Sequence, residues 1–296
     1  MHPAPSIIMF TTLSGLGFGL LTFLGLNMPD VDGWVLFTFF FIGYALSVGG
    51  LLSSTFHLGH PERAWRAFSQ WKTSWLSREG ICAVAALTVL GIYALLAIFF
   101  DTKVAFLGWI GAALSLATVF TTSMIYTQMK TVPRWNHWTT PALFLCLSLA
   151  GGALLASKLG VAAPLLIAAL AIQAYAFLSG DKRFSERGHT LNTATGLNGG
   201  EMRMFEAPHT GTNYLMKEMV HQIGRKHATR LRIIGMGLGL FVPWLLLIAL
   251  PVGHLIAIPV IVLHLGGVLA LRWLSLPRLS MLSVSITGNM DDIHSH

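Results

Sequence analysis

The densest group of chemically active side chains lies in one polar stretch, residues 53–80, which reads SSTFHLGHPERAWRAFSQWKTSWLSREG. His57 and His60 stand three positions apart, so they face a similar direction if the preceding helix continues that far. Arg63 follows them, and Glu79 stands at the mouth of the next apolar segment. Imidazole, guanidinium and carboxyl groups therefore gather where a polar loop meets two apolar segments.

This set of groups suits a quinone site. Such a site needs an apolar groove for the isoprenoid tail, a hydrogen-bond donor for each carbonyl, and a titratable group, because reduction to quinol takes up two protons. A histidine titrates near neutral pH. A carboxylic acid kept partly out of water exchanges its proton closer to physiological pH than an exposed one. His57 and Glu79 fit these roles.

Two plainer interpretations stay open for the same residues. Glu79 is favourable near a helix N-terminus and can pair with Arg78 or Arg63. His57 can be a capping histidine, which hydrogen-bonds to the free backbone groups at the end of a helix. The spacing alone does not decide between these interpretations and a quinone site.

The composition places these residues in a membrane protein. Of 296 residues, 54% are hydrophobic and only 10% are charged, with a mean hydropathy of +0.67; soluble domains carry about 25% charged residues. The net charge of +7 comes from Lys and Arg that stand between apolar runs, which is typical of membrane topology signals. No aromatic–basic signature accompanies them, so nucleic acid is not an expected partner.

The apolar runs predict an all-α, polytopic bundle of eight transmembrane helices. About 20 apolar residues are enough to cross hydrocarbon as a helix. We expect one membrane anchor domain over 1–274, with a polar loop at 180–230, followed by a polar C-terminal tail at 275–296. The predicted spans are 6–27, 34–57, 80–100, 104–127, 138–157, 161–179, 231–251 and 254–274.

The charges also predict an orientation. With eight spans, both termini and the loops 58–79, 128–137 and 180–230 lie on one face. All of the 19 Lys and Arg residues except Lys103 and Lys158 belong to that face. Positively charged loops stay in the cytoplasm. We therefore expect both termini and the long loops on the cytoplasmic side of a bacterial inner membrane.

The interiors of the predicted spans are nearly free of ionisable side chains. Charged residues inside spans usually mark ion or proton pathways, and here the strongly polar candidates are Gln173 and His264. A transporter is therefore disfavoured. Cys82 and Cys146 both lie in apolar runs and form no CxxC motif, so no disulfide framework, iron–sulfur cluster or other metal site is expected in this chain.

An anchor that binds haem b is the alternative function, because several histidines could serve as haem ligands. A haem with two histidine ligands needs them at similar depth on facing helices, and His264 has no evident partner at its depth. Near the cytoplasmic edge, His57 or His60 has three candidate partners, which are His137, His221 and His227.

Four strings in the chain resemble one family. FHLGHPERAWRA and SWLSREG are similar to the membrane anchor subunits of dimethyl sulfoxide reductases, as are MIYTQMK after the fourth predicted helix and KEMVHQIGRKHATRLR before the seventh. The resemblance covers about residues 4–274 and implies the same eight-helix layout. Beyond Trp273 the chain departs from the family pattern, so contacts made by the family's C-terminus are not carried over.

The resemblance implies a function for the polar stretch. Anchors of this family carry no metal and bind an iron–sulfur subunit with four clusters, which connects them to a molybdopterin catalytic subunit. Ubiquinone or menaquinone reacts in the anchor near the iron–sulfur subunit. His57 and Glu79 match the family's quinol-site histidine and glutamate, Arg63 matches the motif arginine, and His60 occupies a more variable position.

The opening MHPAPS is similar to one branch of the family, the anchors of cytoplasmic, quinone-linked sulfite dehydrogenases. The predicted orientation agrees, because it puts the His57 and Glu79 face in the cytoplasm. The branch implies electron transport from sulfite oxidation. Basic residues on that face are expected to dock the partner subunits, and they are Arg66, Lys72, Arg78, Arg225 and Lys226.

Overall fold

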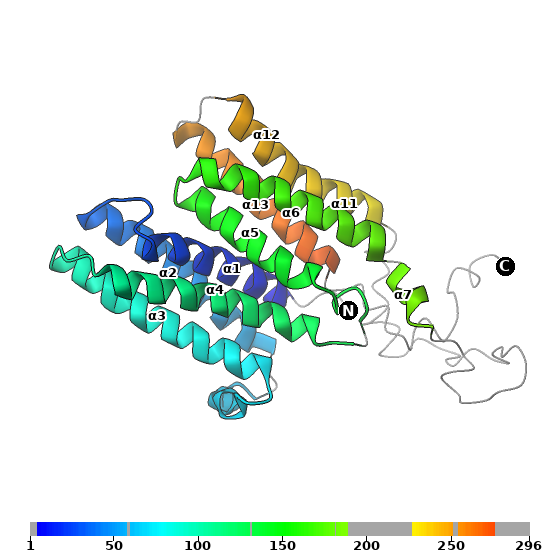
Figure 1. Cartoon of the computed structure of the whole chain (residues 1–296), viewed down its shortest axis with the longest axis horizontal. Coiled ribbons are helices and arrows are strands. Elements are labelled where there is room, and N and C mark those ends of the chain that lie inside the picture. The colour runs from blue at the N-terminus through cyan, green and yellow to red at the C-terminus, as the bar shows by residue number, and fades with distance from the viewer. Residues whose placement is uncertain are drawn as a thin grey trace, which may run out of the picture.

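The computed structural model is a bundle of helices (Figure 1), and it describes residues 5–57, 60–130, 132–180, 182–188, 227–250 and 254–275. These residues contain no strand, which confirms the predicted all-α class. The long helices are α1 (Pro5–Gly25), α2 (Gly33–Ser53), α3 (Trp75–Phe99), α4 (Ala105–Thr127), α5 (Thr139–Leu155), α6 (Leu159–Gly180) and α13 (His254–Ser275). The shorter ones are η1 (Ser54–His57), η2 (Pro61–Gln70), α7 (Lys182–Glu186), α11 (Ala228–Met236), η3 (Gly237–Phe241) and α12 (Val242–Ala249).

Each predicted span coincides with a helix, and seven of the described helices are long and apolar enough to cross a membrane. The run from α11 through α12 counts as one of the seven. The remaining apolar helix, α5, has 17 residues, which is shorter than the roughly 20 that span the hydrocarbon. The described helices thus form a multi-pass membrane protein.

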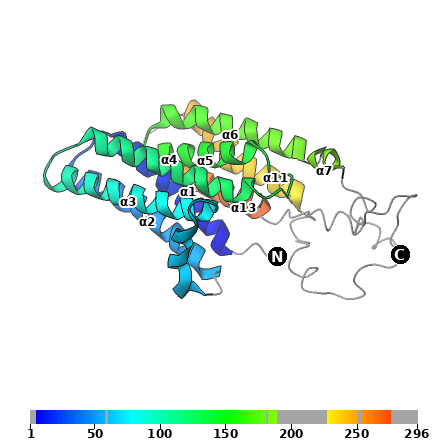
Figure 2. The ribbon, with the colours of Figure 1, turned by 60° about the horizontal axis from the view of Figure 1, so that its bottom comes forward.

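Helix α1 is the centre of the bundle. It contacts α2, α4, α5 and α13, and Figures 1 and 2 show it between the α2–α4 group and α5. In α1, 78% of the apolar span is buried inside the protein, whereas α2 and α6 bury 28% and 22% of theirs. The outer helices therefore present most of their apolar surface outward, where lipid replaces water as the solvent.

Small residues let α1 approach its neighbours closely. A Cβ atom added at Gly19 would collide with the Ser148 carbonyl oxygen of α5, and one added at Gly17 would collide with the Ser47 backbone of α2. The Ser148 hydroxyl donates a hydrogen bond of 2.5 Å to the Gly15 carbonyl oxygen. Such contacts stabilise membrane bundles because lipid gives no hydrophobic drive between helices.

The second half of the bundle contains a π-helical turn, η3, between α11 and α12. Its Gly239 packs directly against Gly267 of α13. The Gly239 carbonyl oxygen also lies 2.8 Å from Nδ1 of the fully buried His264. Because a carbonyl oxygen only accepts hydrogen bonds, the imidazole is the donor in this contact between α13 and the π turn.

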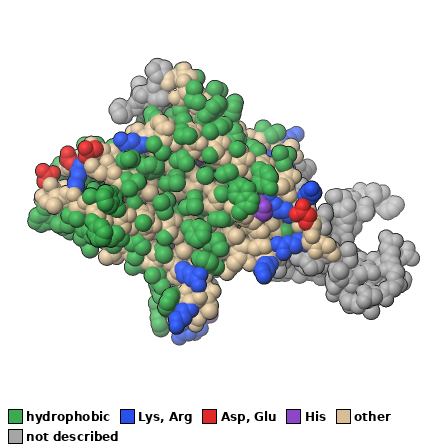
Figure 3. Space-filling model, in the orientation of Figure 1, with side chains coloured by type: hydrophobic (Ala, Val, Ile, Leu, Met, Phe, Trp, Pro, Cys, Tyr) green, Lys and Arg blue, Asp and Glu red, His purple; other side chains and the backbone are tan. Residues whose placement is uncertain are grey.

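Charged side chains lie toward the two ends of the bundle and on the protruding η2, as Figure 3 shows for one face. A broad hydrophobic surface separates them. At one end, Nζ of Lys103 lies 2.7 Å from Asp30 and 2.6 Å from Asp32, joining the α1–α2 and α3–α4 loops. Hydrogen bonding to Lys103 lowers the pKa of Asp30. The bundle thus has the surface expected of a protein surrounded by lipid.

Two predicted boundaries were wrong, and both concern the polar stretch. Helix α2 ends at Ser53 and not at residue 57, and the chain continues as the tighter 3-10 turn η1. Consecutive hydroxyl groups compete for backbone carbonyls there, since Ser54 bonds to the Leu51 carbonyl at 2.6 Å and Thr55 to the Leu52 carbonyl at 2.7 Å. Helix α3 begins at Trp75 and not at residue 80, since hydropathy marks the membrane-buried part of a helix and not its polar first turn.

These boundaries change the expected geometry. His57 lies in the 3-10 turn η1, and residues 58–59 are outside the described part. His57 and His60 therefore do not share the face of one continuous α-helix. Glu79 lies more than one turn inside α3 instead of at its mouth.

The close packing of α1 on α5 gives a testable prediction. Gly19→Ala should destabilise the protein by about 1–3 kcal/mol, since the added methyl group meets rigid backbone. Gly15→Ala on the same helix should have little effect, because no heavy atom lies within 4 Å of the added Cβ. Thermal unfolding of both variants in detergent measures the difference, and equal midpoints would show that the packing is looser than described.

Candidate functional site

Glu79 is the one buried carboxyl group among the described residues, with 3% of its surface exposed. Helix α3 carries it toward α4, where Oγ1 of Thr122 lies 2.5 Å from its Oε1 atom. The same hydroxyl lies 2.8 Å from the Thr118 carbonyl oxygen. Among the described residues, Glu79 bonds to Thr122 and forms no ion pair with Arg63 or Arg78, so the alternative pairing is not observed.

A hydroxyl has one proton, so Thr122 serves one acceptor at a time. When Glu79 is ionised, Thr122 donates to the carboxylate. When Glu79 is protonated, the acid donates to the Thr122 oxygen, and Thr122 donates to the Thr118 carbonyl. Thr122 can thus satisfy both protonation states of the buried acid without a change of partner.

The loop before α3 is held close to this acid. Gly80, next to Glu79, leaves room for the Phe68 ring of η2, which lies 3.1 Å from the position of an added Cβ. Arg78 donates from Nε to the Trp71 carbonyl oxygen at 2.9 Å and from a terminal nitrogen to that of Lys72 at 2.6 Å. Its guanidinium group also lies 4.4 Å from the Trp75 ring centroid. Arg78 therefore fixes η2 to α3.

His60 and Arg63 lie together on η2 and its N-cap, on the surface. The ring atom Nδ1 of His60 lies 3.0 Å from a Glu62 carboxylate oxygen, and Nε of Arg63 lies 3.8 Å from the same oxygen. Their side chains are 68% and 59% exposed. The structure brings these two residues to Glu62 and gives neither a contact with Glu79.

The other predicted site residues divide into exposed ones and ones outside the described residues. Arg66 and Lys72 are exposed and lie against Trp65 and Trp71, at 5.5 and 5.7 Å from the ring centroids. They belong to the segment that protrudes from the bundle (Figure 1). Three predictions fall outside the described residues, namely those on Arg225, on Lys226 and on the side chain of His57.

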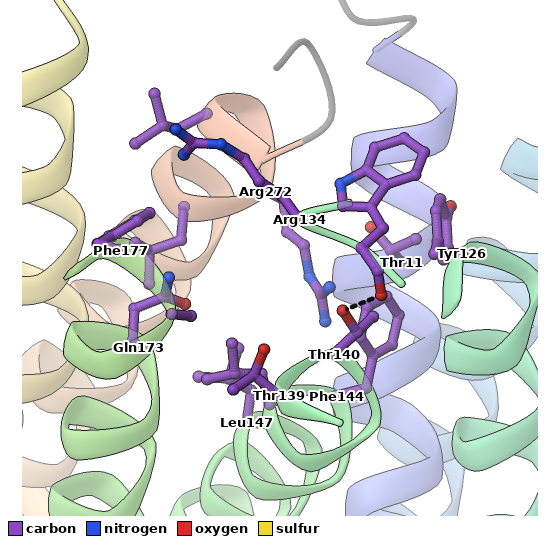
Figure 4. Close-up of a pocket in the computed structure, with 15 residues that line it drawn as sticks. Thr11, Tyr126, Arg134, Thr139, Thr140, Phe144, Leu147, Gln173, Phe177 and Arg272 are labelled. Carbon is purple, nitrogen blue, oxygen red and sulfur yellow. Dashed lines mark hydrogen bonds between the residues drawn. The ribbon is translucent and has the colours of Figure 1, made fainter. Parts of the chain in front are cut away.

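The structure reveals a cavity that no pattern in the sequence predicts. It has a volume of about 100 Å3 and lies between α1, α4, α5, α6 and α13 (Figure 4). Thr11 and Tyr126 lie on one side, with Gln173 and Phe177 on the other. Arg134 and Arg272 also line it, together with Trp135, Thr139, Thr140, Leu143, Phe144, Leu147, Ala176, Leu271 and Leu274.

Arg272 is the most unusual group in this cavity. It is 9% exposed, and its guanidinium carbon lies 3.6 Å from the Phe144 ring centroid, close enough for a cation–π interaction. In the sequence it counts only as one basic residue near a helix end. Its burial follows from the meeting of α13 with α5, which sequence periodicity does not indicate.

Two of the described histidines have surroundings that bear on a haem or metal site. His264 contacts the Gly239 carbonyl through Nδ1. The pKa of His137, just before α5, is lowered by partial burial and by the nearby Arg183. No group of three or more His, Cys, Asp or Glu side chains in the described part of the chain is arranged to hold a metal ion.

Comparisons with known proteins point to one family. A family model described as the DMSO reductase anchor subunit (DmsC) matches residues 1–264. The chain is 30% identical to the C subunit of the sulfite dehydrogenase of Allochromatium vinosum over 92% of its own length and 94% of that relative. It is 31% identical to the anaerobic dimethyl sulfoxide reductase chain YnfH of Escherichia coli, over 53% of this chain and 57% of YnfH. No solved structure matches it.

The bond between Thr122 and Glu79 gives a second prediction. Thr122→Val keeps the shape of the side chain but leaves the buried acid without its partner, which should cost about 1–3 kcal/mol of stability. Thr118→Val is the matched control one turn earlier, because the equally buried Thr118 hydroxyl bonds only to the Leu114 carbonyl of its own helix. If both variants unfold at the same temperature in detergent, the Thr122 bond does not stabilise Glu79.

Proposed function

Because the chain belongs to the DMSO reductase anchor subunit family, we propose that it anchors a molybdenum-dependent oxidoreductase in the membrane and exchanges that enzyme's electrons with quinone. The name of the Allochromatium vinosum relative, which this chain covers almost fully, supports sulfite oxidation as the partner reaction. In that direction the quinone is the electron acceptor. The chain then contributes a binding site and a proton path.

The observation that carries this proposal is the burial of Glu79 against Thr122. The described helices bury no other carboxyl group, and a buried acid in a membrane protein usually marks a proton-handling site. Thr122 satisfies the acid in both protonation states. Glu79 can therefore deliver a proton to a quinone oxygen and be reprotonated from the polar end of α3.

The balance of the proposed reaction is simple. Sulfite and water give sulfate, two electrons and two protons in the catalytic subunit. The electrons pass through the iron–sulfur subunit, which we propose carries four clusters, to the quinone. The quinone takes two electrons and two protons to become quinol. We propose that Glu79 and His57 transfer the protons, and that Arg63 and His60 provide positive charge or hydrogen bonds at the entrance.

The protruding segment η2 and the loop after it provide the proposed docking surface for the iron–sulfur subunit. Arg66 and Lys72 are exposed there beside Trp65 and Trp71. Exposed tryptophan and arginine side chains are enriched in protein interfaces, and Lys72 adds positive charge. Arg225 and Lys226 extend the surface in the proposal, whereas Arg78 acts by holding η2 against α3.

The proposed topology has eight spans, with α5 as the eighth, and both termini in the cytoplasm of a bacterial inner membrane. The basic residues favour this orientation, since Lys103 and Lys158 alone lie in loops at the opposite end. The proposed catalytic partners then lie on the cytoplasmic face.

We propose quinone as the redox group handled by this chain, with no haem b. A haem b with two axial histidines needs a second imidazole that faces the first, and the described residues that line the small cavity beside His264 include no other histidine. An absorption spectrum of the purified complex distinguishes the two cases, since a haem-containing anchor shows a Soret band.

Substitution of Glu79 tests the quinone site. Glu79→Gln keeps the size of the side chain but cannot carry a proton, so quinone-linked sulfite oxidation should fall about 100-fold or more. His57→Ala should also lower it. Oxidation of sulfite with a soluble dye should stay unchanged in both variants, because the dye takes electrons from the partner subunits.

Glu186→Gln is the matched control, since it removes an exposed carboxylate from α7. It should keep full quinone activity. Normal quinone activity in the Glu79 and His57 variants would show that protons reach the quinone by another route. A complex that fails to assemble would be recognised by loss of the dye-linked activity as well.

The proposed orientation can be tested at the two ends of α6. In a variant without Cys82 and Cys146, Lys158→Cys should react with a membrane-impermeant maleimide added to intact spheroplasts. Lys182→Cys, at the other end of the helix, should react only after the membrane is opened. The reverse labelling pattern would invert the topology.

A further inference from the structure

We propose that the cavity lined by Arg134 and Arg272 binds the phosphodiester headgroup of an anionic phospholipid. Glu79 and Thr122 of the proposed quinone site do not line this cavity, and the nearest shared element is α4, whose Tyr126 lines it one turn after Thr122. The inference does not depend on the identity of the redox partner.

The charge of the lining favours an anion. Two arginines line one cavity, Arg134 from the segment between α4 and α5 and Arg272 from α13. No Asp or Glu is among the described residues that line it. An anion held between two arginines lowers the electrostatic cost of placing like charges at one site, and guanidinium groups bind phosphate oxygens with paired hydrogen bonds.

The uncharged residues complete a site for an amphipathic ligand. Gln173, Thr139 and Tyr126 bring further hydrogen-bonding groups to the cavity. The rest of the wall is apolar and is formed by residues such as Leu143, Phe177 and Leu271. This apolar wall suits the glycerol and the first carbons of the acyl chains. The volume of about 100 Å3 is several times the roughly 10–15 Å3 that one water molecule requires.

The position in the bundle also matches a lipid headgroup. The cavity lies where α1 and α5 begin and where α4, α6 and α13 end, which is the end of the bundle that carries most of the basic residues. Basic pockets between transmembrane helices at the cytoplasmic side are typical binding sites for anionic lipids. Both the depth and the sign of the charge are therefore those that such a lipid requires.

A quinone fits this cavity less well than an anionic lipid. Quinone reduction needs a group that exchanges protons near neutral pH. Among the described residues that line the cavity, none is a histidine or a carboxylic acid. The guanidinium groups stay protonated and cannot act in that way.

Native mass spectrometry of the full-length chain in mild detergent tests the proposal. The chain is titrated with dioleoyl phosphatidylglycerol, with phosphatidylcholine of the same acyl chains, with inorganic phosphate and with decylubiquinone. We expect one equivalent of phosphatidylglycerol to bind at least about tenfold more tightly than phosphatidylcholine. Inorganic phosphate and decylubiquinone should not displace it.

Four variants assign the binding to the cavity. Arg272→Gln and Arg134→Gln should each weaken phosphatidylglycerol binding about tenfold, because each removes charge-assisted hydrogen bonds. Ala176→Phe fills the cavity and keeps both arginines, and it should also abolish binding. Arg230→Gln, which removes an exposed guanidinium group from α11, should bind as the unsubstituted chain does.

Several results would overturn the inference. Equal binding of the two phospholipids, or unchanged binding in all three cavity variants, would exclude a selective headgroup site. Displacement by inorganic phosphate would make the cavity a site for the free anion. Displacement by decylubiquinone would make it a quinone site. If Arg272→Gln does not fold, Arg134→Gln and Ala176→Phe still test the proposal, since both variants keep the buried Arg272.

Discussion

The cost of placing an ionised group in hydrocarbon governs the whole arrangement of this chain. The acidic and basic side chains gather at the ends of the bundle and on η2, while the broad surface between them is hydrophobic. The interior is held by other means, since lipid offers the helices no hydrophobic reason to associate. Small residues around α1 and hydroxyl groups bonded to backbone carbonyls take over that role. The few ionisable groups that are buried therefore stand out as candidates for function.

Two candidate sites of opposite charge lie near the basic end. Glu79 lies between α3 and α4 and has a hydroxyl partner that can serve both of its protonation states. Arg134 and Arg272 line a neighbouring cavity, which Tyr126 of α4 reaches one turn after Thr122. An acid suits proton transfer, and a guanidinium group suits permanent binding of an anion. The two sites therefore call for different ligands, although they lie at the same end of the bundle.

Helix α1 packs against both halves of the bundle. It packs against α2 and α4 in the half that carries Glu79, and against α5 and α13 in the half that carries the cavity. Its close contacts with Ser148 and Ser47 leave little room for sliding. The π turn at Gly239, held by His264, adds a second fixed contact within the other half. The ends of the helices, where η2 and the polar loops attach, are left as the places where partner proteins and small molecules can bind.

The sequence by itself determined the helical class, the positions of the apolar segments and the uneven distribution of Lys and Arg, because each follows from local hydropathy and charge. It also singled out Glu79, since an acid beside an apolar segment is conspicuous. Only the tertiary structure decided that Glu79 meets Thr122, 43 residues away, and that Arg272 lies under Phe144 in a cavity with Arg134. These contacts depend on which helices are neighbours and how they are rotated. Nearly every face of a membrane helix is apolar, so periodicity carries little information about either.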